Sequence, residues 1–367
     1  MKPLFLLENR ASCGTICSAV AMPAGFAVQV SSASETKGSE GMLLLNKEDI
    51  KKVFSMADAI EADKECYMAF NRGEFEMPQR AVISGKDGNY LFMPAYSEKM
   101  SAAGLKIVNI MPGNPALGLP ASIGQVLLID GKTGRVVSMM DGTYVTALRT
   151  AAASGAAFDL FGRTDAAVGA IIGTGSQAMS QLEAMLTGRS LREVRVAGRD
   201  MKKTLAFAEE AQRVFEHHGT EIIACDDTNA AVDGADFVIL VTTSSKPVCS
   251  AEFFKEGAVI SAVGAYTYDM QELDPEVFKR CGKIYFDSEE AVLSESGDIL
   301  RPLDEGTLSK DQFTGDIGDC LLGKIPGRES EDEIIVFENV GIGALDLYTA
   351  KKIYEKAIDA KVGTEWE

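Results

Sequence analysis

The residues whose type and spacing point most directly to chemistry lie at 171–178, where IIGTGSQA places Gly173, Gly175 and Ala178 in G-x-G-x-x-A spacing. This spacing is typical of a turn that binds the pyrophosphate of a dinucleotide. The first glycine permits a tight turn, the second lets the pyrophosphate approach the backbone, and the small alanine lets the next helix pack closely. A helix starting near Ser176 would direct its free N–H groups at the phosphates. The alternative is a tight strand-to-helix turn without a ligand. The predicted cofactor contacts here are Gly173, Thr174, Gly175, Ser176, Gln177 and Ala178.

The end of the next expected strand indicates which dinucleotide is bound. NAD-binding folds usually have Asp or Glu there, about 20 residues beyond the glycines, to hold the ribose hydroxyls. In VRVAGRD the position is Gly198, and Arg199 follows it. A missing carboxylate removes repulsion of a 2'-phosphate, and an arginine binds one well. We therefore expect NADP(H) to be preferred. NAD(H) stays possible, because Asp200 would reach the ribose after a small shift of the strand end.

Two further strand ends are expected at the same edge of the sheet, where ligands of open α/β folds bind. Thr242, Thr243 and Ser244 end one strand, and Val263 and Gly264 end the next. We expect all five to line the cofactor. The alternative for the hydroxyl groups is that they satisfy nearby backbone groups.

The elements that must position these residues fall into two groups. A chain of 367 residues predicts two domains. A helical pattern over 46–72 precedes short strand-like segments, which predicts a mainly antiparallel sheet with a helix on it. A helix over 144–162 leads to alternating strands and helices from Asp165, typical of a Rossmann-type doubly wound parallel sheet. The helix at 343–358 is expected to return to the first domain. The expected strands are 80–83, 90–93, 104–110, 125–130 and 135–140, then 167–172, 193–197, 221–225, 236–242, 258–264 and 283–287.

This organisation predicts an α/β fold with three parts. Residues 1–41 form an N-terminal extension that is expected to be poorly ordered. Its uncharged stretch over 11–34 resembles a secretory leader only weakly, because it lacks a solid apolar block. Residues 42–155 with 335–367 form a substrate-binding and dimerisation domain. Residues 156–334 form the dinucleotide-binding domain.

Composition argues against several other classes of function. A net charge of −18 disfavours nucleic-acid binding, which requires a cationic face. The seven cysteines have no zinc-like spacing, and the two histidines are adjacent, so no metal site is expected. The sequence has no run of about 20 apolar residues, so no membrane span is expected. Free cysteines in an odd number fit a reducing, cytoplasmic location.

Seven segments together resemble the ornithine cyclodeaminase and mu-crystallin family, in the family's order from Met42 to the C-terminus. The resemblance implies a substrate domain with a dimer-forming sheet and a Rossmann-type domain. It also implies hydride transfer at the α-carbon of a small amino or imino acid. The segments are MPQRAVI, GLKIVNIMPGNP, ALRTAAASG, AIIGTGSQA, VTTSSKPV, AVGAYTYDMQELD and VGIGALDL.

Carried over residue by residue, the resemblance assigns Arg80, Lys106 and Arg149 to the substrate site. An acidic protein rarely gathers three cations unless an anion binds there, and arginine suits a carboxylate. Clamping the carboxylate would orient the α-carbon against the nicotinamide. Read alone, each has an ordinary role, as a strand-edge residue, a snorkelling lysine or a helix cation.

The loop after the fifth strand of the second domain departs from the family. Members that cyclise ornithine have an Asp two residues after its glycine, whereas here Gly264 is followed by Ala265 and Tyr266. Asp269 would reach the substrate nitrogen if the loop curls back, or it caps the next helix. The proton for nitrogen is expected from Lys106, Asp269 or water, which makes Lys106 and Asp269 the catalytic candidates.

The favoured function is an NAD(P)H-dependent reductase of a small imino acid, or an amino-acid dehydrogenase in reverse. The first alternative is ornithine cyclodeaminase, which forms proline and ammonia. The second is a ligand-binding crystallin-like protein without catalysis. The expected partners are a small amino or imino acid substrate and a second copy of the chain in a homodimer.

Overall fold

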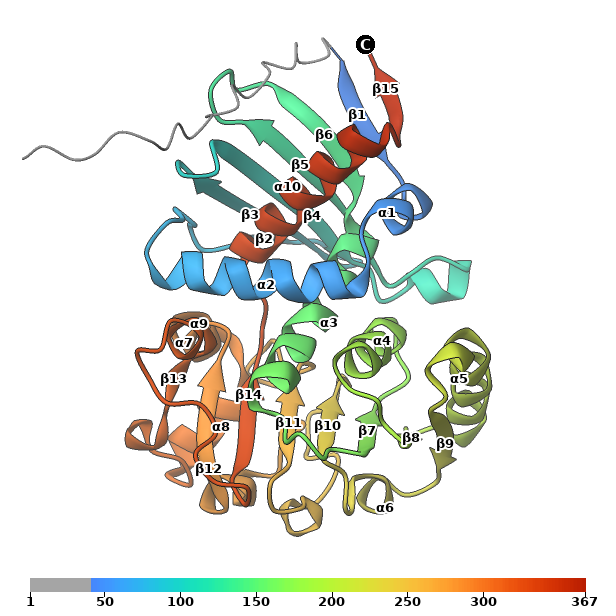
Figure 1. The fold of residues 1–367 in the computed structure, drawn as a ribbon, viewed down its shortest axis with the longest axis vertical. Coiled ribbons are helices and arrows are strands. Elements are labelled where there is room, and N and C mark those ends of the chain that lie inside the picture. Colours follow the sequence, from blue (N-terminus) through green and yellow to red (C-terminus); the bar gives the residue numbers. More distant parts are fainter. Residues whose placement is uncertain (1–40) are drawn as a thin grey trace, which may run out of the picture. The chain divides into compact units, whose positions relative to one another are not determined.

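Two β-sheets, one above the other in Figure 1, organise the part of the chain that this computed structural model describes, residues 41–367. The expected extension lies outside the described residues except for Gly41. The elements are β1 (Met42–Leu45), α1 (Lys47–Val53), α2 (Met56–Asn71), β2 (Ala81–Ser84), β3 (Asn89–Ser97), β4 (Ala102–Ile110), η1 (Asn114–Leu117), β5 (Ser122–Asp130), β6 (Val136–Asp141), α3 (Gly142–Phe161), β7 (Val168–Ile172), α4 (Ala178–Gly188), β8 (Glu193–Ala197), α5 (Met201–Val214), η2 (Glu216–His218), β9 (Glu221–Cys225), α6 (Thr228–Val232), β10 (Phe237–Leu240), η3 (Ala251–Phe253), β11 (Val259–Ala262), η4 (Pro275–Lys279), β12 (Cys281–Phe286), α7 (Glu289–Glu295), α8 (Gly297–Glu305), η5 (Lys310–Gln312), β13 (Gly315–Asp316), α9 (Ile317–Leu321), β14 (Ile334–Glu338), α10 (Gly343–Ala360) and β15 (Thr364–Trp366).

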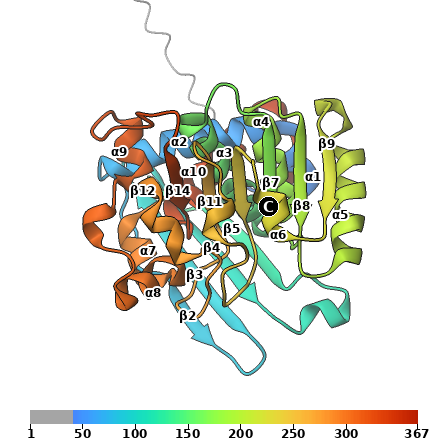
Figure 2. The same cartoon turned by 90° about the horizontal axis from the view of Figure 1, so that it is seen from below.

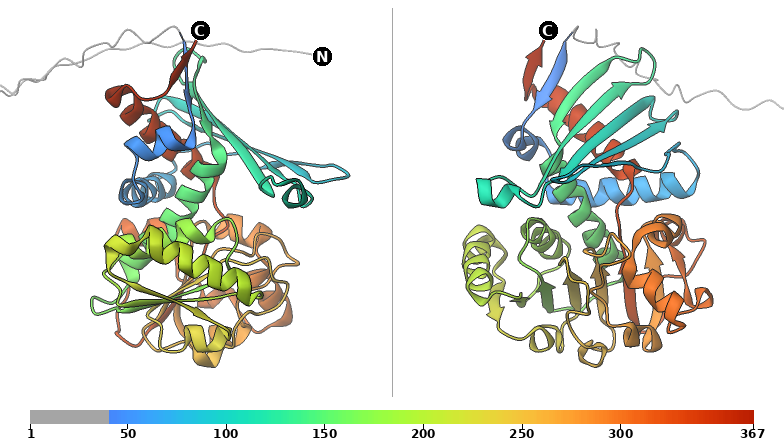
Figure 3. Two further views of the ribbon diagram at one scale, coloured as in Figure 1. Left: turned by 90° about the vertical axis from the view of Figure 1, so that its right-hand side faces the viewer. Right: turned by 180° about the vertical axis from the view of Figure 1, so that it is seen from behind.

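The upper sheet has seven strands in the order β15-β1-β6-β5-β4-β3-β2. Every pair of neighbours is antiparallel except β1 and β6, which confirms the mainly antiparallel sheet. Side chains of β4 alternate between buried and half-buried, because α10 packs on one face of the sheet. Figure 3 shows the helices gathered on that face. As expected, α10 near the C-terminus packs back on the sheet of the first domain.

The helical pattern over 46–72 forms two helices instead of one. Asn46 caps α1, but the chain is extended at Phe54 and a new helix begins after Ser55. The Ser55 hydroxyl accepts from the Asp58 N–H, and the Asp58 carboxylate accepts from the Ser55 N–H. This reciprocal capping box, visible in the sequence as SMAD, is what divides the pattern.

The lower sheet has eight strands, all parallel, in the order β13-β12-β14-β11-β10-β7-β8-β9. Helices lie on both sides of it (Figure 2). Successive strand residues alternate between two separate cores, with Ile171 and Ile239 in one and Ile172 and Leu240 in the other. This confirms the doubly wound Rossmann-type fold. The carboxyl ends of the strands face α2 and the upper sheet (Figure 1).

The last strand of the lower sheet corrects one expected boundary. The sequence predicts that residues 335–367 belong to the first domain, but β14 lies inside the lower sheet between β11 and β12. Its five residues are all buried, as in a central parallel strand covered on both faces. The chain therefore leaves the lower half only after β14, and it enters the upper half as α10.

Candidate active site

Lys106 and Arg149 come from different elements and meet at one carboxylate. Lys106 lies in β4, Arg149 in the middle of α3, and Asp346 in the first turn of α10. Lys106 Nζ is 2.6 Å from Asp346 Oδ2, and Arg149 Nε donates to Asp346 Oδ1 at 3.0 Å. None of the three side chains is more than 6% exposed. No motif predicts this role for Asp346, although it lies within VGIGALDL.

These three residues carry one more positive than negative charge when Lys106 is protonated. Burial and the like charge of Arg149 lower the pKa of Lys106 to about 8, against the opposing effect of Asp346. Burial acts to raise the pKa of Asp346, but Arg149 and Lys106 outweigh it and hold that pKa below its usual value. Excess buried charge is costly unless a counter-ion joins it. The cluster is therefore suited to receive an anion.

Asp63 in α2 borders the same cluster, although no sequence motif includes it. The side chain is fully buried, and neither carboxylate oxygen accepts a well-formed hydrogen bond from the described residues. Burial raises the pKa of Asp63 well above its usual value; the Arg149 charge and the nearby Thr349 hydroxyl act against this, and Asp346 adds to it. Burial therefore disfavours the charged form of this carboxyl group.

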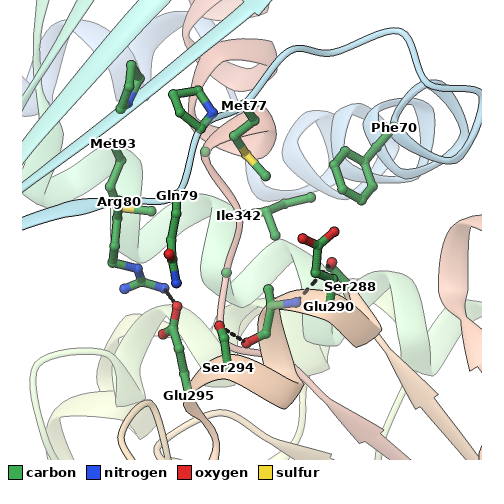
Figure 4. A pocket seen from close by; sticks show the side chains of 15 residues that line it. Phe70, Met77, Gln79, Arg80, Met93, Ser288, Glu290, Ser294, Glu295 and Ile342 are labelled. Atoms are coloured by element: carbon green, nitrogen blue, oxygen red, sulfur yellow. Dashed lines mark hydrogen bonds and ion pairs between the residues drawn. The ribbon is translucent and has the colours of Figure 1, made fainter.

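Arg80 lines a pocket of about 220 Å³ at the carboxyl end of the lower sheet. In Figure 4 its guanidinium points at Glu295, the last residue of α7, and Nη2 lies 2.6 Å from Glu295 Oε1. Apolar side chains form much of the wall, contributed by both halves of the protein. The apolar lining residues are Phe70, Met77, Pro78, Met93, Pro94, Ala291 and Ile342.

Lys106 and Arg149 lie behind the wall of this same pocket. Lys106 is opposite Met93 in the β3–β4 ladder, so the two side chains are neighbours on one face of the sheet. The Arg149 guanidinium packs on Gly341, where an added Cβ would lie 2.3 Å from Nη1. Met93 and Gly341 both line the pocket. The charge of Arg80 also contributes to the low pKa of Lys106. The structure thus brings the three predicted cations together.

The two glycines of the glycine-rich turn differ in their surroundings. Gly173 has φ +119°, and an added Cβ would lie 2.5 Å from the Val241 carbonyl oxygen, so only glycine fits. No atom lies within 4 Å of a Cβ built on Gly175, which leaves its backbone open to a ligand. Helix α4 begins at Ala178, slightly later than expected. Oε1 of Gln177 is buried and has no partner among the described residues.

The tip of β8 carries the residues predicted to choose the dinucleotide. Gly198 directly follows the strand, and Arg199 is exposed. Asp200, the alternative ribose partner, caps α5 by accepting from the N–H groups of Lys202 and Lys203 at 3.0 and 3.3 Å. The carboxylate at this edge is therefore engaged by a helix N-terminus.

The ends of β10 and β11 are joined by a buried carboxyl group that no motif predicted. Glu272 accepts hydrogen bonds from the N–H groups of Thr242 and Gly264, which stand beside Thr243 and Val263 respectively. Burial and the charge of Asp298 raise the pKa of Glu272 to about 8.

The hydroxyl groups at the end of β10 have local partners. The Thr242 hydroxyl accepts from the Ser244 N–H at 3.1 Å, and the Ser244 hydroxyl donates to the Lys246 carbonyl at 2.6 Å. This is the alternative role expected for them. Thr243 is exposed at the edge.

Asp269 lies apart from the pocket described above. Its side chain is exposed on the loop after β11, and it is not among the residues that line the pocket. It does not cap the next helix, η4, because Asp274 does so by accepting from the Glu276 N–H at 3.1 Å. The expected capping role of Asp269 is therefore wrong.

Within residues 41–367 there is no group of three or more His, Cys, Asp or Glu side chains that could hold a metal ion. None of the helices in this part of the chain is long and apolar enough to cross a membrane.

Comparison with known proteins gives matches along nearly all of the described chain. The family model for the ornithine cyclodeaminase/mu-crystallin family matches residues 40–361. A Delta(1)-pyrroline-2-carboxylate reductase from Bacillus cereus is 33% identical over 328 residues, which are 89% of this chain and 100% of that protein.

Solved structures are similar over the same extent. The Thermococcus litoralis Delta(1)-pyrroline-2-carboxylate reductase, in complex with NADH and L-proline, has a TM-score of 0.83 at 36% identity, covering 88% of this chain and 99% of that one. An archaeal alanine dehydrogenase dimer with bound NAD has a TM-score of 0.81 at 33% identity, with 89% and 99% covered.

Proposed function

The chain belongs to the ornithine cyclodeaminase/mu-crystallin family, and from that premise we propose that it is an NAD(P)H-dependent enzyme that reduces a small α-imino acid. The reverse reaction is oxidation of the amino acid. The observation that carries the proposal is that Arg80 lines a pocket at the carboxyl end of the Rossmann-type sheet, while Lys106 and Arg149 lie directly behind Met93 and Gly341 of its wall. The names of a reductase of pyrroline-2-carboxylate and of an alanine dehydrogenase among its relatives support it.

The three cations bind and orient the substrate in this proposal. The substrate carboxylate supplies the counter-charge that Lys106 and Arg149 lack, and each charge-assisted contact contributes ~1.5–3 kcal/mol. The apolar wall excludes water from the reacting carbon. When bound, a reduced nicotinamide would supply the hydride. Lys106, with its pKa near 8, holds the proton for the product nitrogen. Asp269 is the weaker donor candidate because it is exposed.

The cofactor would be held by the turn from Gly173 to Ala178 and by the ends of β10 and β11. The proposed preference is for NADP(H), because Gly198 offers no carboxylate at the ribose position and Arg199 is exposed beside it. The engagement of Asp200 as a helix cap supports the same choice.

The proposed assembly is a homodimer formed through the upper sheet. Val82 and Ile83 of the edge strand β2 are 51% and 59% exposed, and Leu117 in the β4–β5 connection is 75% exposed. Apolar side chains exposed in this number favour a protein partner. The archaeal alanine dehydrogenase is also a dimer. Light scattering on the purified protein measures the oligomeric mass.

The decisive experiment is a spectrophotometric assay of NADPH and NADH oxidation with a panel of cyclic and linear imino acids. Reduction of pyrroline-2-carboxylate or a similar ketimine supports the proposal. Release of ammonia from ornithine with catalytic cofactor would instead identify a cyclodeaminase. No turnover with the whole panel, together with tight ligand binding, would identify a binding protein.

A further inference from the structure

One ion pair crosses the pocket between the two halves of the protein. Arg80 immediately precedes β2 of the upper sheet, and Glu295 ends α7 beside the lower sheet. Their side chains are 18% and 17% exposed, and the two charged groups point at each other in Figure 4. A largely desolvated pair is held more firmly than a surface pair, because water screens it less.

The two ends of this ion pair differ in how firmly the backbone holds them. All four residues of β2 are exposed, and β2 is the last strand at its edge of the sheet. Glu295 is followed by the fully buried Ser296, which ends α7 and caps α8. The Ser296 hydroxyl donates to Glu338 Oε1 at 2.6 Å, and Glu338 ends the central strand β14. The carboxylate is therefore the anchored partner.

Arg80 has more donors than its shortest contact with Glu295 uses. That contact joins Nη2 to Oε1, whereas a guanidinium has donors on all three nitrogens. The contact with Glu295 restrains where the guanidinium lies, and its remaining donors can bind a second carboxylate. Glu295 and a substrate can thus bind Arg80 at the same time.

We propose that Glu295 is a positioning residue that sets the orientation of Arg80 relative to the carboxyl end of the Rossmann-type sheet. The inference rests on the proposed function, in which Arg80 binds the substrate carboxylate. A substrate held from the upper half must meet a cofactor held by the lower half, and small misplacement slows such reactions strongly. The Arg80–Glu295 pair connects the upper half, which holds the substrate in this proposal, to the half that contains the Rossmann-type sheet.

Glu295→Ala is expected to lower kcat/KM for the imino acid by about 10- to 100-fold, through both kcat and KM. The dissociation constant for NADPH should not change. Glu295→Gln should recover part of the loss, because its amide oxygen still accepts from Arg80. The matched control is Glu74→Ala, which removes another glutamate, 18% exposed and 2.8 Å from Lys99, outside this pocket. The control should keep wild-type kinetics.

A double-mutant cycle with Arg80→Ala separates action through Arg80 from any other effect. If Glu295 acts through Arg80, the double variant has the kcat/KM of Arg80→Ala alone. Multiplied losses in the double variant would overturn the inference. So would a rise in kcat/KM for Glu295→Ala, because it would mean that Glu295 competes with the substrate. Full activity of Arg80→Ala would contradict the proposed binding of the substrate carboxylate by Arg80. It would then also overturn the inference about Glu295.

Discussion

Lys106 and Asp346 form an ion pair of 2.6 Å whose side chains are only 2% and 3% exposed. Removing two charges from water costs more than their attraction returns, unless further polar partners contribute. Arg149 is that partner, since it binds the other oxygen of the same carboxylate. Asp346 therefore holds two cations from different elements in place before any substrate arrives.

Replacing Asp346 with Asn should destabilise the protein by about 3–5 kcal/mol, because Lys106 and Arg149 would be buried without a counter-charge. Urea denaturation followed by circular dichroism measures the change. Asp359→Asn, an exposed substitution on the same helix, should alter stability little. A loss no larger than that of the control would contradict the central role of Asp346.

The pH dependence of turnover should follow Lys106. Its pKa is lowered to about 8, so the ammonium proposed to bind the substrate carboxylate and to supply the proton is lost as pH rises through that value. We expect kcat/KM for the imino acid to fall above pH ~8. Lys106→Arg keeps the charge to higher pH and should shift this alkaline limb upward, although with lower activity. An identical limb in both proteins would assign it to another group.

Asp63 should make the wild-type protein less stable as pH rises. Burial raises the pKa of Asp63 in the folded protein. At a pH above the pKa that Asp63 has in the unfolded chain, unfolding therefore releases a proton, and the free energy of unfolding decreases as pH rises. The stability that Asp63 contributes is therefore fully present below its pKa in the unfolded chain, and it is lost as pH rises through its pKa in the folded protein. Asp63→Asn removes the titration, and its Tm should exceed that of wild type at pH 8 by more than at pH 4. Parallel Tm curves would refute this.

The two glycines of the dinucleotide turn should respond differently to alanine. Gly173→Ala places a Cβ 2.5 Å from the Val241 carbonyl at positive φ, so both Tm and cofactor affinity should fall. At Gly175 there is open space, so Gly175→Ala should keep the wild-type Tm and lose only cofactor affinity. Calorimetry with NADPH and thermal melts of both variants provide the comparison. Equal NADPH affinity in Gly175→Ala and wild type would place the pyrophosphate elsewhere.

Arg199→Ala should lower kcat/KM for NADPH by about 10- to 100-fold, because one charge-assisted contact with the 2'-phosphate is lost. The value for NADH should stay within about twofold, since NADH lacks that phosphate. Steady-state kinetics with each cofactor at saturating imino acid test this. A parallel decrease for both cofactors would show that Arg199 does not read the 2'-phosphate.

Features set by neighbouring residues could be predicted from the sequence. The glycine turn lies between a strand and a helix as expected, since its spacing reports local backbone geometry. The alternating pattern likewise identified β7 to β12 and the two-sheet architecture. The break between α1 and α2 was missed, although the Ser55 capping box is a local signal that could have revealed it.

Features that depend on distant partners could not be predicted in this way. Strand β14 reads as a plain apolar run, and nothing in it states that it pairs between β11 and β12. The same holds for the carboxyl groups of the site. Asp346 and Glu295 find their cations only after the fold has brought distant segments together.

Because the chain runs directly from β14 into α10, both halves of the protein depend on the same C-terminal segment. Truncating the chain before β14 would remove an inner strand of the lower sheet. It would also remove Asp346, whose carboxylate binds Lys106 and Arg149. Neither half can be excised as an autonomous module or exchanged with a relative's by a single crossover. A recombinant chain must therefore keep β14 and α10 from the same parent as the strands and cations that they contact.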